Sequence, residues 1–161
     1  MKVEDLIPYI NNPRNNENAI DKVASSIQEF GFKVPIVVDK NNVILSTGYN
    51  GFPYGCSDDE FPWDRDGDDT KYKYVVHAEL NAILNSRGKS LTGAKLYVDL
   101  FPCNECAKAI IQSGVGEVVY LYDKYAHTAE TQASKRMLTA AGVKFKQLVT
   151  DKKKIELDFE R

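Results

Sequence analysis

From residue 34 onward, strand-like and helix-like segments alternate along the chain, and this order limits the possible folds more than any other feature. The stretch VPIVVDKNNVILSTGY (34–49) predicts two strands joined by a turn at Asp39–Asn42. An apolar run predicts a buried strand at 94–101, EVVYLYD predicts another at 117–123, and the alternating pattern of VKFKQLV predicts a last strand at 143–149. Helical patterns separate these later strands. The alternation predicts an α/β fold in which helices pack on a central sheet.

Four helices are expected. The first covers 17–30 and stops at Gly31, and the second begins near Val76–His77. The third follows Pro102 and is closed by Gly114, and the fourth, at 129–142, is ended by Gly142. With 161 residues and no internal repeat or linker, the chain is expected to form a single domain over 1–161.

Charge and composition favour a small ligand over a polymer or a membrane. The formal net charge is −2, and the only basic block is the short run Lys152–Lys154, so a nucleic-acid partner is not expected. No apolar run approaches the length of a membrane span. The start MKVEDLIPYI has no apolar signal-peptide core, which predicts a cytoplasmic protein.

Candidate metal ligands stand at the starts of two predicted helices. His77 and Glu79 open one helix, and Cys103 and Cys106 open the next. A helix start favours thiolates, which are the forms of cysteine that bind metal. One nitrogen and two sulfurs without an obvious fourth ligand indicate a catalytic zinc with an open position. Glu79, beside such a site, would move protons.

Simpler interpretations of these residues remain open. A lone histidine at a helix start is commonly a cap or a core residue, and a lone Cys-x-x-Cys can be redox-active or part of a zinc knuckle. The odd total of three cysteines argues against a disulfide framework. A calcium loop over DRDGDDTKYKYV (64–75) fails, because Asp69 and Val75 replace the required glycine and glutamate.

Taken together, the motifs identify a family resemblance. His-x-Glu followed by Pro-Cys-x-x-Cys is the signature of zinc deaminases that act on nucleobases. The stretches STGYNGFPYGCSDDEFPW, YVVHAELNAIL and YVDLFPCNECAKAIIQSGVGEVVYLYDKY resemble deoxycytidylate (dCMP) deaminases. The resemblance covers about 43–150 and implies a three-layer cytidine-deaminase-like fold, in which helices flank a central five-stranded mixed sheet.

The resemblance also implies a reaction and a set of roles. Zinc held by His77, Cys103 and Cys106 would activate water for attack on C4 of dCMP, and the products would be dUMP and ammonia. Glu79 would carry a proton to N3 and then to the leaving amine. Further contacts with the substrate are implied for the Phe101 carbonyl, Asn50, Tyr125, Ala78 and Asn81. Asn81 is equally well explained as a helix surface residue.

Regulation and assembly are implied in the same way. Members of this family are commonly homo-hexamers that dCTP activates and dTTP inhibits, with Mg²⁺ bound beside the triphosphate. The effector region would include Asn50, Gly51, Gly55 and Cys56. Turn geometry alone would also explain the two glycines.

The beginning of the chain departs from the family. Residues 6–44 resemble the start of ParB-type nuclease domains, but the Gly-His-x-Arg motif of those proteins is absent and Gly48–Gly51 stands in its place. Cleavage of DNA or nucleoside triphosphates is therefore not expected. Lys33 is a candidate for the 5′-phosphate of the substrate, with an ordinary surface lysine as the alternative. A front end from another source would suit a viral or phage enzyme.

Three alternatives to a dCMP deaminase remain. One is a nucleotide-responsive regulatory protein built on a deaminase scaffold, although Glu79 would then have no purpose. Another is a deaminase of a different cytosine nucleoside or nucleotide. The last is a polynucleotide deaminase, which the acidic net charge disfavours.

Overall fold

A computed structural model of the chain describes residues 34–150. The expected helix at 17–30 and Lys33 lie outside the described residues. Within 34–150 there are two compact units, one made of 52–75 and the other of 34–51 together with 76–150. No helix in this part of the chain is both long and apolar enough to cross a membrane.

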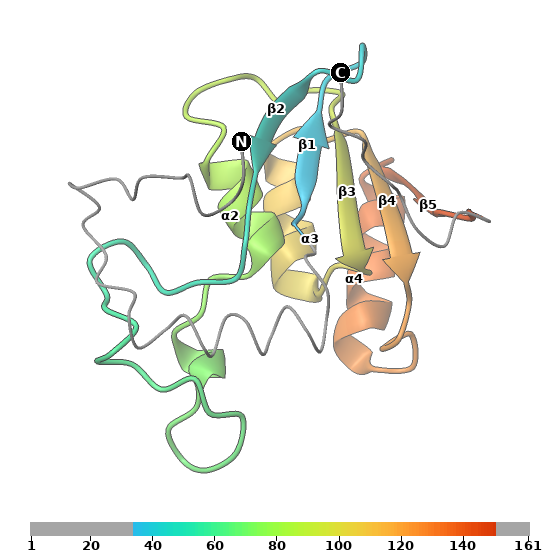
Figure 1. Cartoon of the computed structure of the whole chain (residues 1–161). Coiled ribbons are helices and arrows are strands. Elements are labelled where there is room, and N and C mark those ends of the chain that lie inside the picture. Colours follow the sequence, from blue (N-terminus) through green and yellow to red (C-terminus); the bar gives the residue numbers. More distant parts are fainter. Residues whose placement is uncertain (1–33, 151–161) are drawn as a thin grey trace, which may run out of the picture. The chain divides into compact units, whose positions relative to one another are not determined.

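A five-stranded mixed sheet organises the larger unit, in the order β2-β1-β3-β4-β5 (Figure 1). β1 is antiparallel to β2 and β3, whereas β3, β4 and β5 run parallel to one another. The sheet confirms the strands expected from the sequence, with slightly shorter bounds. They are β1 (Ile36–Val38), β2 (Ile44–Thr47), β3 (Lys95–Leu100), β4 (Glu117–Tyr122) and β5 (Lys144–Gln147).

The turn between β1 and β2 forms where the sequence predicts it. The Asp39 carboxylate accepts hydrogen bonds from the backbone N–H groups of Asn41, at 2.8 Å, and Val43, at 2.9 Å. Asn42 takes a positive φ of 63°, which asparagine tolerates better than most residues. The side chain of Asp39 therefore closes this hairpin.

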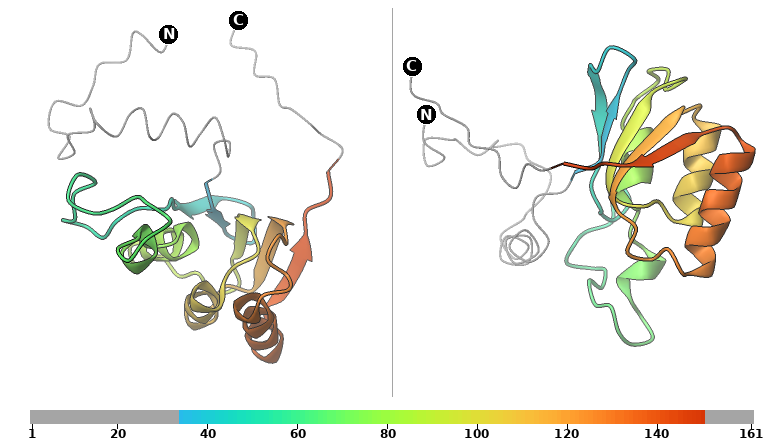
Figure 2. Two further views of the ribbon diagram at one scale, coloured as in Figure 1. Left: turned by 90° about the horizontal axis from the view of Figure 1, so that it is seen from below. Right: turned by 90° about the vertical axis from the view of Figure 1, so that its right-hand side faces the viewer.

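Three helices cover one face of the sheet: α2 (Ala78–Leu84), α3 (Asn104–Gln112) and α4 (Ala129–Ala140) (Figure 2). Two successive right-handed crossovers, β3-α3-β4 and β4-α4-β5, require α3 and α4 to lie on the same face. The buried core between helices and sheet includes Val37, Ala82, Leu96, Val98, Ala107, Ile110, Val118 and Leu138. The expected fold has a third layer, which needs the helix at 17–30. That helix lies outside the described residues.

The direction of the chain brings the three helix starts to one edge of the sheet. α3 and α4 begin where the parallel strands β3 and β4 end (Figure 1). α2 runs up to the loop that leads into β3, so its start lies at this edge too. Ligands in open α/β sheets are commonly bound at the carboxyl ends of the strands.

Residues 52–75 form a small unit of their own around aromatic side chains. The ring centroid of Phe52 lies 5.5 Å from that of Phe61 and 4.7 Å from that of Trp63, and Phe61 lies 5.2 Å from Tyr74. The sequence predicts an irregular segment here. The structure adds one short 3₁₀ helix, η2 (Lys71–Lys73).

Candidate metal centre and active site

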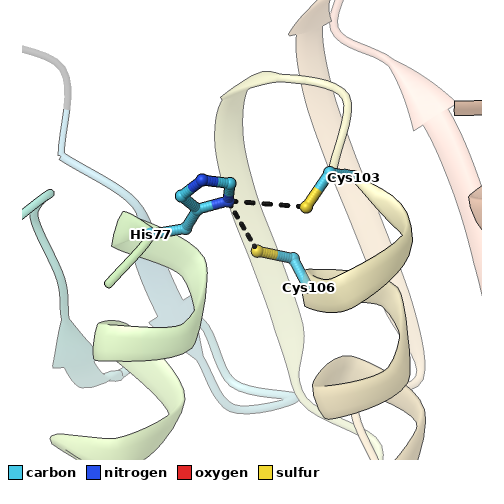
Figure 3. A group of neighbouring side chains, drawn as sticks. All are labelled: His77, Cys103 and Cys106. Atoms are coloured by element: carbon cyan, nitrogen blue, oxygen red, sulfur yellow. Dashed lines mark hydrogen bonds between the residues drawn. The ribbon is translucent and has the colours of Figure 1, made fainter. Parts of the chain in front are cut away.

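The three predicted metal ligands converge in the structure. His77 is the N-cap residue of α2 and Cys103 is the N-cap residue of α3, and Cys106 lies in the first turn of α3. His77 Nδ1 lies 3.4 Å from Cys103 Sγ and 3.5 Å from Cys106 Sγ (Figure 3). Among the described residues, this is the only group of three or more potential ligands that come together.

The spacing of these atoms fits a tetrahedral zinc ion. Zinc bonds of about 2.3 Å to sulfur and about 2.0–2.1 Å to nitrogen place the nitrogen about 3.6 Å from each sulfur. All three ligand atoms lie within 4.8 Å of one another. Figure 3 shows one ring nitrogen of His77 directed at both sulfurs. Two thiols and one imidazole form a donor set that zinc prefers, and one tetrahedral position is left over.

Solvent reaches the cluster from the histidine side. His77 is exposed and Cys103 is partly exposed, whereas Cys106 is 2% exposed. A structural zinc site usually encloses its ion with four protein ligands. Three ligands with one open side are the arrangement expected for a site that admits a small molecule.

Glu79 is the acid–base candidate beside the cluster. The Cys106 thiol donates to Glu79 Oε2 at 3.7 Å. Burial raises the pKa of the Glu79 carboxyl group, and the residue as a whole is half-buried. A carboxyl group with a raised pKa exchanges protons more readily near neutral pH than an ordinary glutamate does.

The two thiols form a coupled pair. A hydrogen bond from Cys106, together with one from His77, lowers the pKa of Cys103 to about 3. The same bond to Cys103, together with burial, raises the pKa of Cys106. The hydrogen bond with Cys103 raises the pKa of His77. A divalent cation would allow both sulfurs to be thiolates at once, because a metal ion deprotonates its coordinating thiols.

Hydrogen bonds from the segment before the 52–75 unit hold α2 in place. Ser46 Oγ donates to the Ala82 carbonyl at 2.7 Å, and this bond is buried. Asn50 Oδ1 accepts from the Ala78 backbone N–H at 2.9 Å. Ala78 follows His77 directly, and His77 has no side-chain cap of its own. Asn50 therefore caps the helix that carries His77 and Glu79.

Two asparagines, Asn81 within α2 and Asn85 at its C-cap, reach back to the same segment. Asn81 Nδ2 donates to the Tyr49 carbonyl at 2.7 Å, and Asn85 Nδ2 donates to the Thr47 carbonyl at 3.0 Å. They are four residues apart, so both point from one face of the helix. These bonds fix the rotation of α2 about its axis.

Gly48 allows this close approach. A Cβ atom at Gly48 would lie 2.1 Å from the Ala78 carbonyl oxygen and 2.3 Å from the Ala82 backbone nitrogen. Both neighbours are backbone atoms and cannot rotate away. Only glycine fits at this position without moving α2.

The family model for the cytidine and deoxycytidylate deaminase zinc-binding region matches residues 15–122. This range includes the three clustered ligands and Glu79. The chain belongs to this deaminase family. The match begins at residue 15, within the ParB-like segment 6–44, whose resemblance stays a prediction because most of it lies outside the described residues.

Individual relatives agree with the family. The chain is 54% identical over 132 residues to a probable deoxycytidylate deaminase of Drosophila melanogaster, which covers 77% of this chain and 65% of the relative. It is 48% identical over 127 residues to the human deoxycytidylate deaminase, covering 77% and 71% respectively. The chain thus spans about two thirds of the length of these relatives.

A solved structure of similar fold is the dCMP deaminase of cyanophage S-TIM5 in complex with dCMP and dUMP. It matches with a TM-score of 0.55 and 27% identity, over 92% of this chain and 99% of that chain. The five-stranded sheet with its helices is therefore the cytidine-deaminase-like fold.

The remaining predicted site residues of this chain are placed as follows. Phe101 is 7% exposed at the end of β3, and its carbonyl accepts no hydrogen bond from any described residue. Tyr125 is 47% exposed in the loop after β4. Ala78 is buried. Asn50 and Asn81 hold α2, and their substrate contacts stay predictions.

The four residues of the predicted effector region fall in different units. Asn50 and Gly51 belong to the sheet unit, where Gly51 pairs with Val76 in an isolated bridge. Gly55, with a φ of +88°, and Cys56 belong to the 52–75 unit. Their effector role stays a prediction.

Sequence reasoning missed the residues that hold α2. Ser46 and Gly48 act on a helix thirty or more positions further along the chain. The spacing of Asn81 and Asn85 on one helix face was the available signal, since two amides at i and i+4 indicate a polar contact. It gave no indication of the partner.

We predict that Gly48→Ala displaces α2 and weakens the metal centre. The new methyl group would overlap backbone atoms, which costs about 1–3 kcal/mol of folding free energy. Thermal unfolding and zinc competition with a chromogenic chelator would show a lower unfolding temperature and weaker zinc retention. Gly51→Ala is the control, because its Cβ would meet only the Tyr49 ring, at 3.3 Å. Unchanged zinc retention in Gly48→Ala would contradict this account.

Proposed function

We propose that this chain is a zinc-dependent dCMP deaminase, which converts dCMP and water to dUMP and ammonia. The observation that carries the proposal is the meeting of His77, Cys103 and Cys106 beside Glu79 in a member of this family. Relatives named deoxycytidylate deaminase support the choice of substrate, as does the S-TIM5 enzyme, whose structure contains dCMP and dUMP.

His77 Nδ1 and the sulfurs of Cys103 and Cys106 would hold the zinc ion. Bound zinc would supply Lewis-acid activation of the water that replaces the amino group. The sheet edge fixes the start of α3, with Cys103 at its N-cap and Cys106 in its first turn, and the Asn50 cap fixes the start of α2 beside His77. The three ligands are therefore held before any ion binds, which lowers the cost of ordering the site.

Glu79 would carry the protons. It would accept a proton from the attacking water and deliver it to N3 of the cytosine ring. It would then accept the second proton of that water, from the new C4 hydroxyl, and deliver it to the amine, so that ammonia leaves and the C4 carbonyl of dUMP forms. Each transfer needs a carboxyl group whose pKa lies nearer to neutrality than usual, and burial shifts Glu79 in that direction. One side chain can then serve as base and acid in turn.

The substrate would be held by groups at the same edge of the sheet. The Phe101 carbonyl has a free acceptor for the exocyclic amine. Asn50 uses Oδ1 to cap α2, which leaves its Nδ2 to donate to a sugar hydroxyl. Tyr125 offers an exposed ring beside the nucleotide, and Ala78 and Asn81 would line the pocket. Lys33 remains the candidate for the 5′-phosphate.

We further propose the regulation implied by the family resemblance. dCTP with Mg²⁺ would activate a cytoplasmic homo-hexamer and dTTP would inhibit it, through the region of Asn50, Gly51, Gly55 and Cys56. Deamination rates at subsaturating dCMP, measured with Mg²⁺ and either dCTP or dTTP, test whether the first activates and the second inhibits. Sedimentation tests the hexamer.

We predict that the purified, zinc-loaded protein deaminates dCMP faster than cytidine or single-stranded DNA. The relatives named deoxycytidylate deaminase support the nucleotide, and a net charge of −2 disfavours a nucleic-acid polymer. Loss of cytosine absorbance measures the reaction with each compound, with and without dCTP. Absence of dCMP turnover under both conditions would refute the proposed function.

Two substitutions separate metal binding from proton transfer. Glu79→Gln should keep one zinc ion per chain and lose at least ~100-fold in kcat, because the amide cannot carry the proton. Cys103→Ala should lose zinc itself, since it removes one of three ligands. The zinc content and kcat are measured for both variants. The assigned roles would be wrong if both variants stayed active.

A further inference from the structure

A partly buried ion pair lies at the same edge of the sheet as the metal centre but contacts none of the metal ligands. Lys135 Nζ on α4 lies 2.5 Å from Asp123 Oδ2, in the loop after β4, and the two side chains are only 26% and 21% exposed. The other carboxylate oxygen of Asp123 is buried and has no hydrogen-bond partner among the described residues. Among the described residues, Lys135 is therefore the side chain that holds the Asp123 carboxylate in place.

The cation of this pair rests on the ring of Phe101. Lys135 Nζ lies 5.1 Å from the centroid of the ring, which is within the range of a cation–π interaction. Tyr120 and Phe145 pack edge-on against the same ring, at 4.9 Å and 5.4 Å between centroids. The Phe101 ring is therefore held by two aromatic edges and one ammonium group.

The backbone of Phe101 is held by the same part of β4. Its N–H donates to the Tyr122 carbonyl at 2.9 Å, and Tyr122 directly precedes Asp123. Its carbonyl oxygen accepts no hydrogen bond within the described part of the chain. Pro102 follows Phe101 and restricts the ψ of Phe101 to the extended region, so the contacts that hold the ring and the N–H also set the direction of this free carbonyl.

We propose that Asp123 and Lys135 are positioning residues that aim the Phe101 carbonyl at the amino group of the substrate. This inference rests on the proposed function. A carbonyl oxygen accepts a hydrogen bond from the C4 amine of dCMP, whereas dUMP has an oxygen at C4 and cannot donate to it. The ion pair thereby favours binding of the substrate over the product.

The test compares Lys135→Met, Lys135→Arg and Asp123→Asn with the wild type in the zinc-loaded protein. Lys135→Met and Asp123→Asn should lower kcat/KM for dCMP about fivefold to tenfold, which is the effect of one weakened hydrogen bond. The inhibition constant of dUMP for the same two variants should change by less than about twofold. Lys135→Arg keeps the charge and the stacking, and should stay within about threefold of the wild type.

Lys108→Met is the matched control, because it breaks a lysine–carboxylate pair with Glu105 on α3 that does not touch Phe101. Zinc content and unfolding temperature are measured for every variant. The positioning role would be overturned if Lys135→Met weakened inhibition by dUMP as much as it lowered kcat/KM for dCMP. It would also be overturned if Lys135→Met had the same kinetics as Lys108→Met. Either result would leave the proposed function intact. A wild type without dCMP turnover would refute both.

Discussion

The separation between the starts of α2 and α3 is the constraint on which the rest of the site depends. His77 comes from one helix and both cysteines come from the other, so the three ligand atoms meet only if the two helices keep their spacing. β3 fixes α3 through Pro102. Gly48 and the bonds of Ser46 and Asn50 fix α2. The core of the sheet thereby sets distances of 3.4 and 3.5 Å at its edge.

The sequence predicts much of this arrangement, and the reasons are physical. Alternating strands and helices leave few topologies, and right-handed crossovers bring helix starts to one edge. A histidine at one start and a Cys-x-x-Cys at the next must then lie near each other. The strands, the turn closed by Asp39 and the deaminase family follow from local patterns of this kind.

What the sequence does not show are the contacts between residues far apart in the chain. Periodicity indicates that a side chain is buried or that two amides share a face, but it does not identify the partner. The close approach of Gly48 to α2 and the stacking of Lys135 on Phe101 depend on how whole elements pack. The aromatic packing within 52–75 was hidden for the same reason, because its members follow no regular spacing.

X-ray absorption at the zinc edge of the purified protein tests the central claim most directly, because it counts the atoms bound to the metal. The account predicts two sulfurs at about 2.3 Å and two lighter atoms at about 2.0–2.1 Å, one of them an imidazole nitrogen. Replacing His77 with alanine should lower the zinc content, because it removes one of three ligands, and the zinc that remains should show the two sulfurs without the imidazole signal. A site with four sulfurs, or a protein that binds no zinc, would contradict the claim that two helix starts form an open metal centre.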